Sequence, residues 1–176
     1  MDSASIISSG NEADAYGPAV AGISWALVAL IATGIVGLIV AAPLAQQAGH
    51  PGFAAAIYKS FSYVCHQIPE RSFHLHGEKF AVCSRCTGLY SGLAVATLIY
   101  PVARALKDTL SPSLWWLVLG ALPLAIDFSL GYFHIWANTH LTRFITGALL
   151  GSVAVFFILP GFIQMTLSIR RTARSH

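Results

Sequence analysis

Charged residues are scarce in this sequence. Asp, Glu, Lys and Arg make up 10% of the 176 residues, whereas soluble domains carry roughly 25%. Hydrophobic residues reach 56%, and the mean hydropathy is +0.68. The net charge of +3 comes from scattered basic residues, so the chain lacks the basic stripe or patch that binds nucleic acid. The composition excludes a nucleic-acid-binding protein and indicates a protein that partners with the lipid bilayer.

Cysteine is also rare. The chain has three cysteines, which is an odd number and too few for the disulfide framework of a small secreted domain. All three lie in one stretch, Cys65 to Cys86. A pair spaced as CxxC can simply be two buried small residues at the start of a helix. The odd count and the neighbouring histidines favour metal binding or thiol chemistry over that interpretation.

Long apolar segments dominate the rest of the chain. A helix needs about 20 apolar residues to cross a bilayer. The sequence therefore predicts an all-α, polytopic membrane protein with one transmembrane domain over residues 20–167. Its four expected transmembrane helices cover about residues 20–45, 87–103, 114–133 and 141–165.

Shorter segments flank these spans. Residues 53–64 are apolar but too short to cross, and they predict an interfacial or re-entrant helix. Residues 65–86 form a polar loop that contains the cysteines. We expect a disordered tail over residues 1–19, where polar residues are frequent, and a basic tail over residues 168–176.

Closely spaced glycines occur in three of the predicted spans. Such small residues allow a neighbouring helix to approach closely. We expect this approach at three pairs: Gly34 and Gly37, Gly88 and Gly92, and Gly147 and Gly151.

Four spans place the loops after the first and third spans on the same membrane face. The polar loop and a second polar cluster, residues 127–143, should therefore meet there, with both termini on the opposite face. Lys and Arg divide equally between the two faces, so the positive-inside rule alone gives a tie. If Arg85 and Arg143 are discounted as parts of a site, the rule places the termini in the cytoplasm.

The cysteines and one histidine have the spacing of a metal site. Cysteines three residues apart can direct both sulfurs to one ion, which is why CxxC recurs in zinc sites. The candidate metal ligands are Cys65, His66, Cys83 and Cys86, with Zn²⁺ as the expected ion. Adjacent residues point in different directions, so His74 or His76 can replace His66, or water or substrate can occupy the fourth position. A closed site would be structural, and an open one could activate water.

The same residues allow a redox function. Cys86 stands just before the first turn of a predicted helix, and Arg85 adds positive charge there. Both features stabilise a thiolate. By analogy with small helical membrane proteins that carry a surface CxxC at a helix start, the alternative function is a membrane thiol-disulfide oxidoreductase that exchanges electrons with a quinone, with Cys65 as a resolving or shuttle thiol.

The second polar cluster contains a carboxylate inside an apolar span. Asp127 would be costly there without a partner, so it is a functional candidate. We expect an ion pair with Arg143, which would join the third and fourth spans. The candidate catalytic residues are Asp127, Asn138, His140, Arg143, Arg71 and Arg85.

Arginine suggests a third function. Arg71, Ser72 and Arg85 could bind an anionic lipid headgroup or a phosphate beside the metal. This pattern would suit a metal-dependent hydrolase or transferase that processes lipids.

The stretch CHQIPERSFHLHGEKFAVCSRCTGLYSG, Cys65 to Gly92, resembles a family of small prokaryotic membrane proteins known as domain of unknown function 2085. The family pattern is C-H-x-x-P-x-R-S-F, a glycine, and V-C-x-R-C-x-G-x-Y-x-G. A second block is similar at Pro123, Asp127, Asn138, Arg143, Thr146, Gly147 and Gly151.

The resemblance covers roughly residues 55–160, and Phe128 stands where family members often have glycine. It implies a multi-pass protein of the inner (cytoplasmic) membrane of a prokaryote. The family carries no activity that could be transferred, so the resemblance supports the map of the site and leaves open whether the protein is an enzyme.

Overall fold

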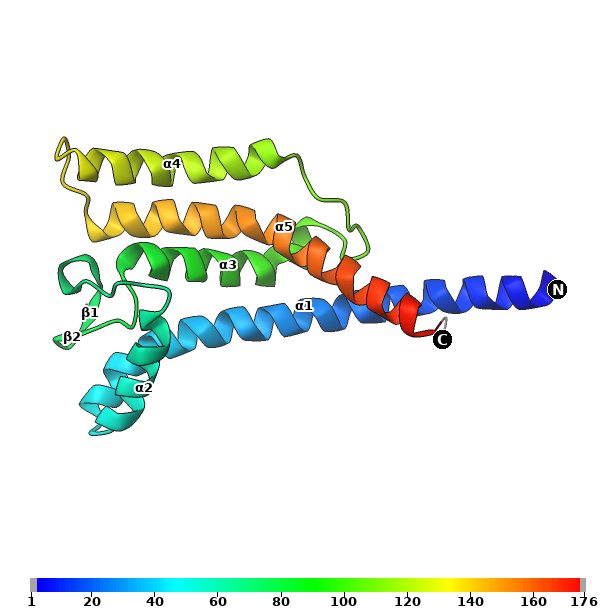
Figure 1. Ribbon diagram of the computed structural model, residues 1–176, viewed down its shortest axis with the longest axis horizontal. Helices are drawn as coiled ribbons and strands as arrows, with labels where there is room; N and C mark the ends of the chain where they lie inside the picture. The colour runs from blue at the N-terminus through cyan, green and yellow to red at the C-terminus, as the bar shows by residue number, and fades with distance from the viewer. Residues whose placement is uncertain (1–2, 175–176) are drawn as a thin grey trace.

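The computed structural model describes residues 3–174 as a bundle of helices with a small polar cap at one end (Figure 1). The elements are α1 (Ser3–Gln47), α2 (Pro51–Ser62), a 3₁₀ turn η1 (Pro69–Arg71), β1 (His74–Leu75), β2 (Glu78–Lys79), α3 (Ser84–Ala103), α4 (Leu114–Tyr132) and α5 (His140–Arg174).

Four helices in the described part of the chain are long and apolar enough to cross a membrane. They are Pro18–Gln47, Ser84–Ala103, Leu114–Tyr132 and His140–Ile169. The predicted all-α class and the four spans are confirmed. α1 also takes in most of residues 1–19, and α5 takes in much of residues 168–176; the disorder of the first tail stays a prediction.

The direction of each helix decides what meets at each end. α1 and α4 run toward the polar cap, and α3 and α5 run away from it (Figure 1). The cysteine-containing loop and the α4–α5 connection therefore lie at one end of the bundle, as expected. The opposite end carries both termini and the α3–α4 connection.

The closest helix pair is α3 and α5, which are parallel neighbours with interlocking glycines. A Cβ added at Gly88 would overlap the backbone of Phe144, and one added at Gly147 would overlap the carbonyl of Arg85. Gly92 and Gly151 make equivalent contacts one turn further along. The prediction is confirmed for these two pairs. The α3 pair packs on α5, and the α5 pair packs on α3.

The third glycine pair behaves differently. A Cβ added at Gly34 or Gly37 of α1 would meet no atom within 4 Å. The expectation of close helix packing at this pair is wrong, because α1 turns these glycines away from its neighbours. Spacing alone does not show which face of a helix is covered.

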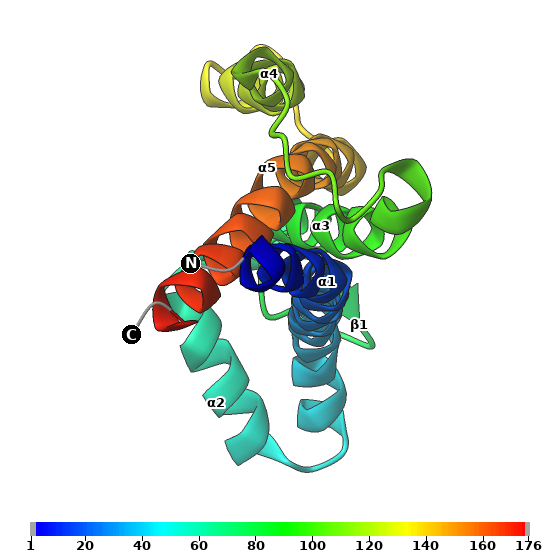
Figure 2. The ribbon, with the colours of Figure 1, turned by 90° about the vertical axis from the view of Figure 1, so that its right-hand side faces the viewer.

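Helix α4 stands apart from the other spans. It packs mainly on α5, and Figure 2 shows it separated from α1 and α3. Gly120, its most enclosed residue, faces the side chain of Val153. Large apolar side chains along α4, such as Trp115 and Leu122, are exposed. These side chains are suited to contact with lipid.

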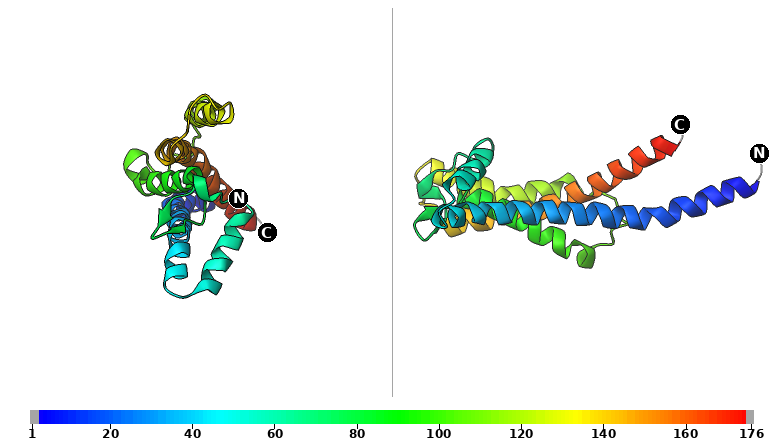
Figure 3. Two further views of the ribbon diagram at one scale, coloured as in Figure 1. Left: turned by 90° about the vertical axis from the view of Figure 1, so that its left-hand side faces the viewer. Right: turned by 90° about the horizontal axis from the view of Figure 1, so that it is seen from below.

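Apolar contacts hold the polar cap onto the bundle. Ile57 and Phe61 of α2 pack with Ile39 of α1 and Val82 of the loop, and the Ala81 N–H donates to the Ile39 carbonyl at 3.3 Å. Figure 3 shows α2 and the hairpin gathered at this end. The predicted short helix thus forms, over Pro51–Ser62.

The β1–β2 hairpin closes with a two-residue turn. Leu75 pairs with Glu78, and the intervening His76 and Gly77 have φ values of +51° and +91°. Two consecutive positive φ angles are typical of a type I′ turn, which favours glycine at the second position. This turn folds the chain back so that Phe80 to Cys83 reach α3.

Candidate functional site

The three cysteine sulfurs lie together at the polar cap. Cys65 follows α2 and is buried, Cys83 is the residue that caps α3, and Cys86 lies in the first turn of α3. All three cysteines are free, and their sulfurs lie within 4.8 Å of one another. The Cys83 and Cys86 sulfurs are 3.5 Å apart. Cys86 is inside the helix, not before it, because α3 begins at Ser84.

Backbone donors surround the Cys65 sulfur. The N–H groups of Gln67 and Cys83 approach it at 3.4 and 3.3 Å. Gln67 has a φ of +51°, and this left-handed turn folds its N–H back onto the sulfur. Hydrogen bonding with Cys65 and Cys86 holds the pKa of the Cys83 thiol well below its ordinary value. A cluster of sulfurs with these donors is suited to a thiolate-binding metal ion.

The structure distinguishes among the candidate histidine ligands. His66 is exposed, and it lines the same cavity as the three cysteines. His74 lies in β1, and His76 lies in the hairpin turn. Neither of these two is among the lining residues. Within the described residues, the atoms close enough to share an ion are the three sulfurs, and a role for His66 as fourth ligand stays a prediction.

Asp127 forms its ion pair with Arg85. The Arg85 Nη2 atom lies 2.5 Å from the Asp127 Oδ2 atom, and the two side chains are 22% and 10% exposed. The expected Asp127–Arg143 pair is therefore wrong. The Arg85 side chain extends from the first turn of α3 to this carboxylate, although α3 and α4 are not packed against each other. Arg85 also lies over the Phe128 ring, 5.6 Å from its centroid.

Asn138 holds the end of α4. Its side-chain amide donates to the backbone carbonyl of Asp127. A Cβ added at Gly131 would overlap the Asn138 side chain. Gly131 is thus required for this contact, although it is absent from the residues predicted from the sequence. The sequence feature that could have identified Gly131 is its position, one helical turn after Asp127.

His140 makes a different contact from the other candidates. The buried Ser84 hydroxyl lies 2.9 Å from both the Arg71 carbonyl and the His140 Nδ1 atom. A hydroxyl has one proton, and a carbonyl can only accept it, so His140 donates from Nδ1. This link joins α5 to α3 and the loop. His140 is not among the residues that line the cavity.

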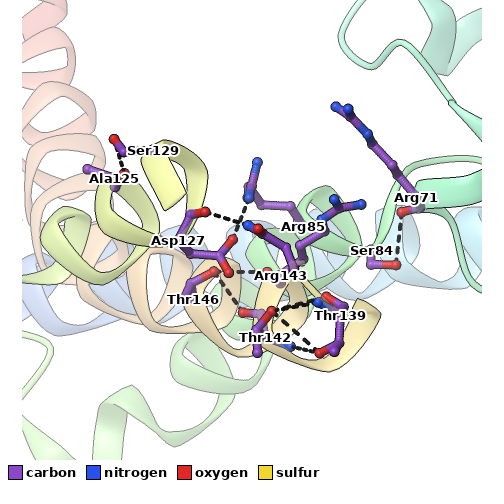
Figure 4. Close-up of polar contacts among 11 residues, drawn as sticks. Arg71, Ser84, Arg85, Ala125, Asp127, Ser129, Thr139, Thr142, Arg143 and Thr146 are labelled. Atoms are coloured by element: carbon purple, nitrogen blue, oxygen red, sulfur yellow. Dashed lines mark hydrogen bonds and ion pairs between the residues drawn. The ribbon is translucent and has the colours of Figure 1, made fainter. Parts of the chain in front are cut away.

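A cavity of about 480 Å³ opens beside the sulfurs. The loop, α3, α4, α5 and the α4–α5 connection all contribute to its wall. Its lining residues are Val64, Cys65, His66, Gln67, Ile68, Arg71, Cys83, Arg85, Cys86, Phe128, Gly131, Tyr132, Asn138 and Arg143. Figure 4 shows Arg71, Arg85 and Arg143 extending from three different elements. The Ser72 hydroxyl instead donates to the Ile68 carbonyl within the loop.

Comparisons with known proteins identify relatives over the same region. Residues 65–157 match the family model described as "Predicted membrane protein (DUF2085)". The chain is 40% identical over 109 residues to the uncharacterized protein MJ1492 of Methanocaldococcus jannaschii, covering 62% of this chain and 70% of the relative.

A second archaeal relative gives a similar result. An uncharacterized protein of Methanothermobacter thermautotrophicus is 38% identical over 87 residues, which cover 49% of this chain and 77% of the relative. No solved structure matches the chain. The matched family region contains both the cysteines and the Asp127–Arg143 segment.

Proposed function

The chain belongs to the DUF2085 family of predicted membrane proteins, and we propose that it binds Zn²⁺ at one membrane face through Cys65, Cys83 and Cys86. The observation that carries this proposal is the set of three free sulfurs within 4.8 Å of one another. They come from the two ends of one loop, where Cys65 and Cys83 are 18 residues apart. Thiolate sulfur is a preferred ligand of zinc, which takes four ligands.

The fourth ligand decides what the metal does. If His66 binds, the ion is closed by protein atoms and links the loop to α3. If a water or another ligand from the cavity binds instead, the ion acts as a Lewis acid that lowers the pKa of bound water. Either arrangement is compatible with three sulfurs that line one cavity.

Metal analysis tests the proposal. Protein purified in detergent should contain about one zinc per chain, measured by plasma mass spectrometry. Cys83→Ser should lose the metal, whereas Ser62→Ala, at the end of α2, should retain it. Loss of metal in His66→Ala would identify a closed site, and retention would identify an open one. Wild-type protein that binds no zinc, even after reconstitution under reducing conditions, would contradict the proposal.

Thiol-disulfide exchange is the second candidate function. The 3.5 Å separation of the Cys83 and Cys86 sulfurs favours it, as does their position at the electropositive start of α3. Oxidation would join these two sulfurs in a disulfide, and the two electrons and two protons released would reduce a quinone to a quinol. Metal-free wild-type protein with a quinone-dependent Cys83–Cys86 disulfide would support this function over zinc binding.

Lipid processing is the third candidate. The three arginines that line the cavity support it, together with Asn138 beside them. Asp127 has its carboxylate engaged by Arg85, so we assign it to positioning that arginine. This function additionally needs an open metal position and a bound anion.

We further propose that the site lies on the outer face of the inner membrane, with both termini in the cytoplasm. The support is the count of Lys and Arg in the loops once Arg85 and Arg143 are treated as parts of the site. A fluorescent reporter fused after residue 176 should be active, because green fluorescent protein folds in the cytoplasm. An alkaline phosphatase fusion that is active at the same point would reverse the orientation.

A further inference from the structure

We propose that the cavity binds a phosphate-type anion between Arg71, Arg85 and Arg143, beside the three sulfurs. The proposal names a ligand class for the site described under Proposed function, and its position beside a metal rests on that proposed function. The phosphate could belong to a lipid headgroup or be free in solution. The same recognition chemistry applies to both.

The first argument is an excess of positive charge. Three guanidinium groups line the cavity, and Arg85 is neutralised by Asp127. Among the described residues, neither Arg71 nor Arg143 has a salt-bridge partner. Arg71 and Arg85 repel Arg143 electrostatically, and Asp127 and Cys83 offset part of that repulsion. A bound anion would reduce the remaining repulsion and so stabilise the arrangement.

A metal ion does not remove this excess. Zn²⁺ with three thiolates carries one net negative charge, whereas Arg71 and Arg143 carry two positive charges. One positive charge is left for a further anion. Arginine presents paired N–H donors that match the oxygen atoms of a phosphate.

The backbone adds to the same preference. α3 and α5 are parallel, and Arg85 and Arg143, in their first turns, line the cavity. Helix N-termini carry partial positive charge, which favours anions. The Arg85 Nε atom is buried without a hydrogen-bond partner in the described structure. The ion pair with Asp127 therefore does not satisfy every donor of this guanidinium group.

Part of the remaining wall of the cavity is apolar. Val64, Ile68, Phe128 and Tyr132 line it, and the Val64 and Tyr132 side chains are 64% and 68% exposed. A membrane lipid would place its phosphate at the arginines and its glycerol and first methylenes against these residues. Inorganic phosphate would use the arginines alone.

Two probes test the proposal on the full chain. The first is radiolabelled inorganic phosphate, titrated onto protein in nanodiscs of phosphatidylcholine. The second is phosphatidic acid, mixed with phosphatidylcholine in vesicles, and its co-purification with the protein is measured by mass spectrometry. Binding of phosphate identifies a site open to the free anion, and binding of phosphatidic acid alone identifies the lipid headgroup. Failure of both probes would overturn the proposal.

Matched variants show whether the cavity is the site. Arg143→Gln and Arg71→Gln should each weaken binding about tenfold or more, because each removes a charge-assisted hydrogen bond. Lys59→Gln removes an exposed cation near the same end of the bundle that does not line the cavity, and should leave binding unchanged. Equal losses in all three variants would indicate general surface attraction and overturn the proposal.

Two further measurements keep the outcome clear. Arg143→Lys keeps the charge but loses the paired donors, so it should weaken anion binding. If this variant unfolds at the same temperature as the wild type, misfolding does not explain the loss of binding. Metal content is measured in every sample. Normal metal without anion binding overturns this inference and leaves the proposed zinc site standing. Arginine-dependent anion binding in protein that contains no metal would support this inference and contradict the proposed zinc site.

Discussion

The two ends of the bundle each contain an arginine–aspartate pair, but the pairs differ in kind. At the end that carries the termini, Arg104 binds Asp108 four residues away at 2.9 Å, and the Asp108 side chain is 43% exposed. At the site end, Arg85 of α3 binds Asp127 of α4, whose side chain is 10% exposed. The first pair can form locally, whereas the second requires the folded bundle.

The surroundings of the pairs differ as well. Tyr100, Leu159 and Ile163 form a buried apolar cluster toward the end that carries the termini. The site end has a buried apolar cluster as well, which includes Ile39, Phe61 and Cys65. Beside that cluster lie the glycine contacts between α3 and α5, a partly buried ion pair and a cavity. The two ends therefore differ in this polar cavity, which makes the site end suited to bind a ligand.

The largest effect should come from the glycine contact. Gly147→Leu would push a side chain into the Arg85 carbonyl, and should cost about 4 kcal/mol or more, or prevent folding. A Cβ added at Gly161, in the same helix, would meet no atom within 4 Å, so Gly161→Leu should change stability little. Thermal unfolding in detergent measures both. Equal effects would show that the two halves of α5 are not packed differently.

The second largest effect should come from the ion pairs. Asp127→Ala leaves Arg85 unpaired beside two other arginines, and should lower the free energy of unfolding by about 3 kcal/mol. Asp108→Ala removes the exposed i,i+4 pair and should have no measurable effect. Unfolding of the two variants by sodium dodecyl sulfate compares them. A greater loss for Asp108→Ala would reverse the proposed difference between the ends.

Metal removal should act at the site end alone. Cys65 and Cys83 are 18 residues apart, and an ion that joins them restricts the unfolded loop. A chelator should then lower stability by about 2 kcal/mol, by analogy with other crosslinks of this length. Hydrogen exchange should increase in residues 63–83 and stay unchanged around Tyr100. Faster exchange at both ends would indicate a global effect.

The smallest effect should come from the ring under Arg85. Phe128→Leu keeps an apolar side chain but removes the cation–π contact, and should cost about 0.5 kcal/mol. Tyr63→Leu removes the corresponding contact with Lys59 at the surface and should be neutral. Thermal unfolding checks this pair. A neutral Phe128→Leu would show that the Asp127 pair alone positions Arg85.

Much of the site could be predicted because it depends on local properties. The cysteine loop and the cluster at residues 127–143 were expected to share a membrane face, since an even number of crossings separates them. Gly88 and Gly147 were expected to contact a neighbouring helix, because a glycine leaves room for close approach at any position in a span. The expectations for Arg143 and Gly34 failed, because the partner of a side chain depends on how each helix is rotated.

The sequence by itself determined the four spans, the polar loop and the end of the bundle where the cysteines lie. These features follow from hydropathy and chain direction, which need no knowledge of which helices touch. Only the tertiary structure decided that Arg85 rather than Arg143 binds Asp127, that Gly131 makes room for Asn138, and that three arginines share one cavity. The shared cavity depends on which helices α5 packs between, and the Asn138 contact depends on how the α4–α5 connection folds back onto α4. Neither is specified by a local pattern, because the partner of a side chain is set by how each helix is placed and rotated.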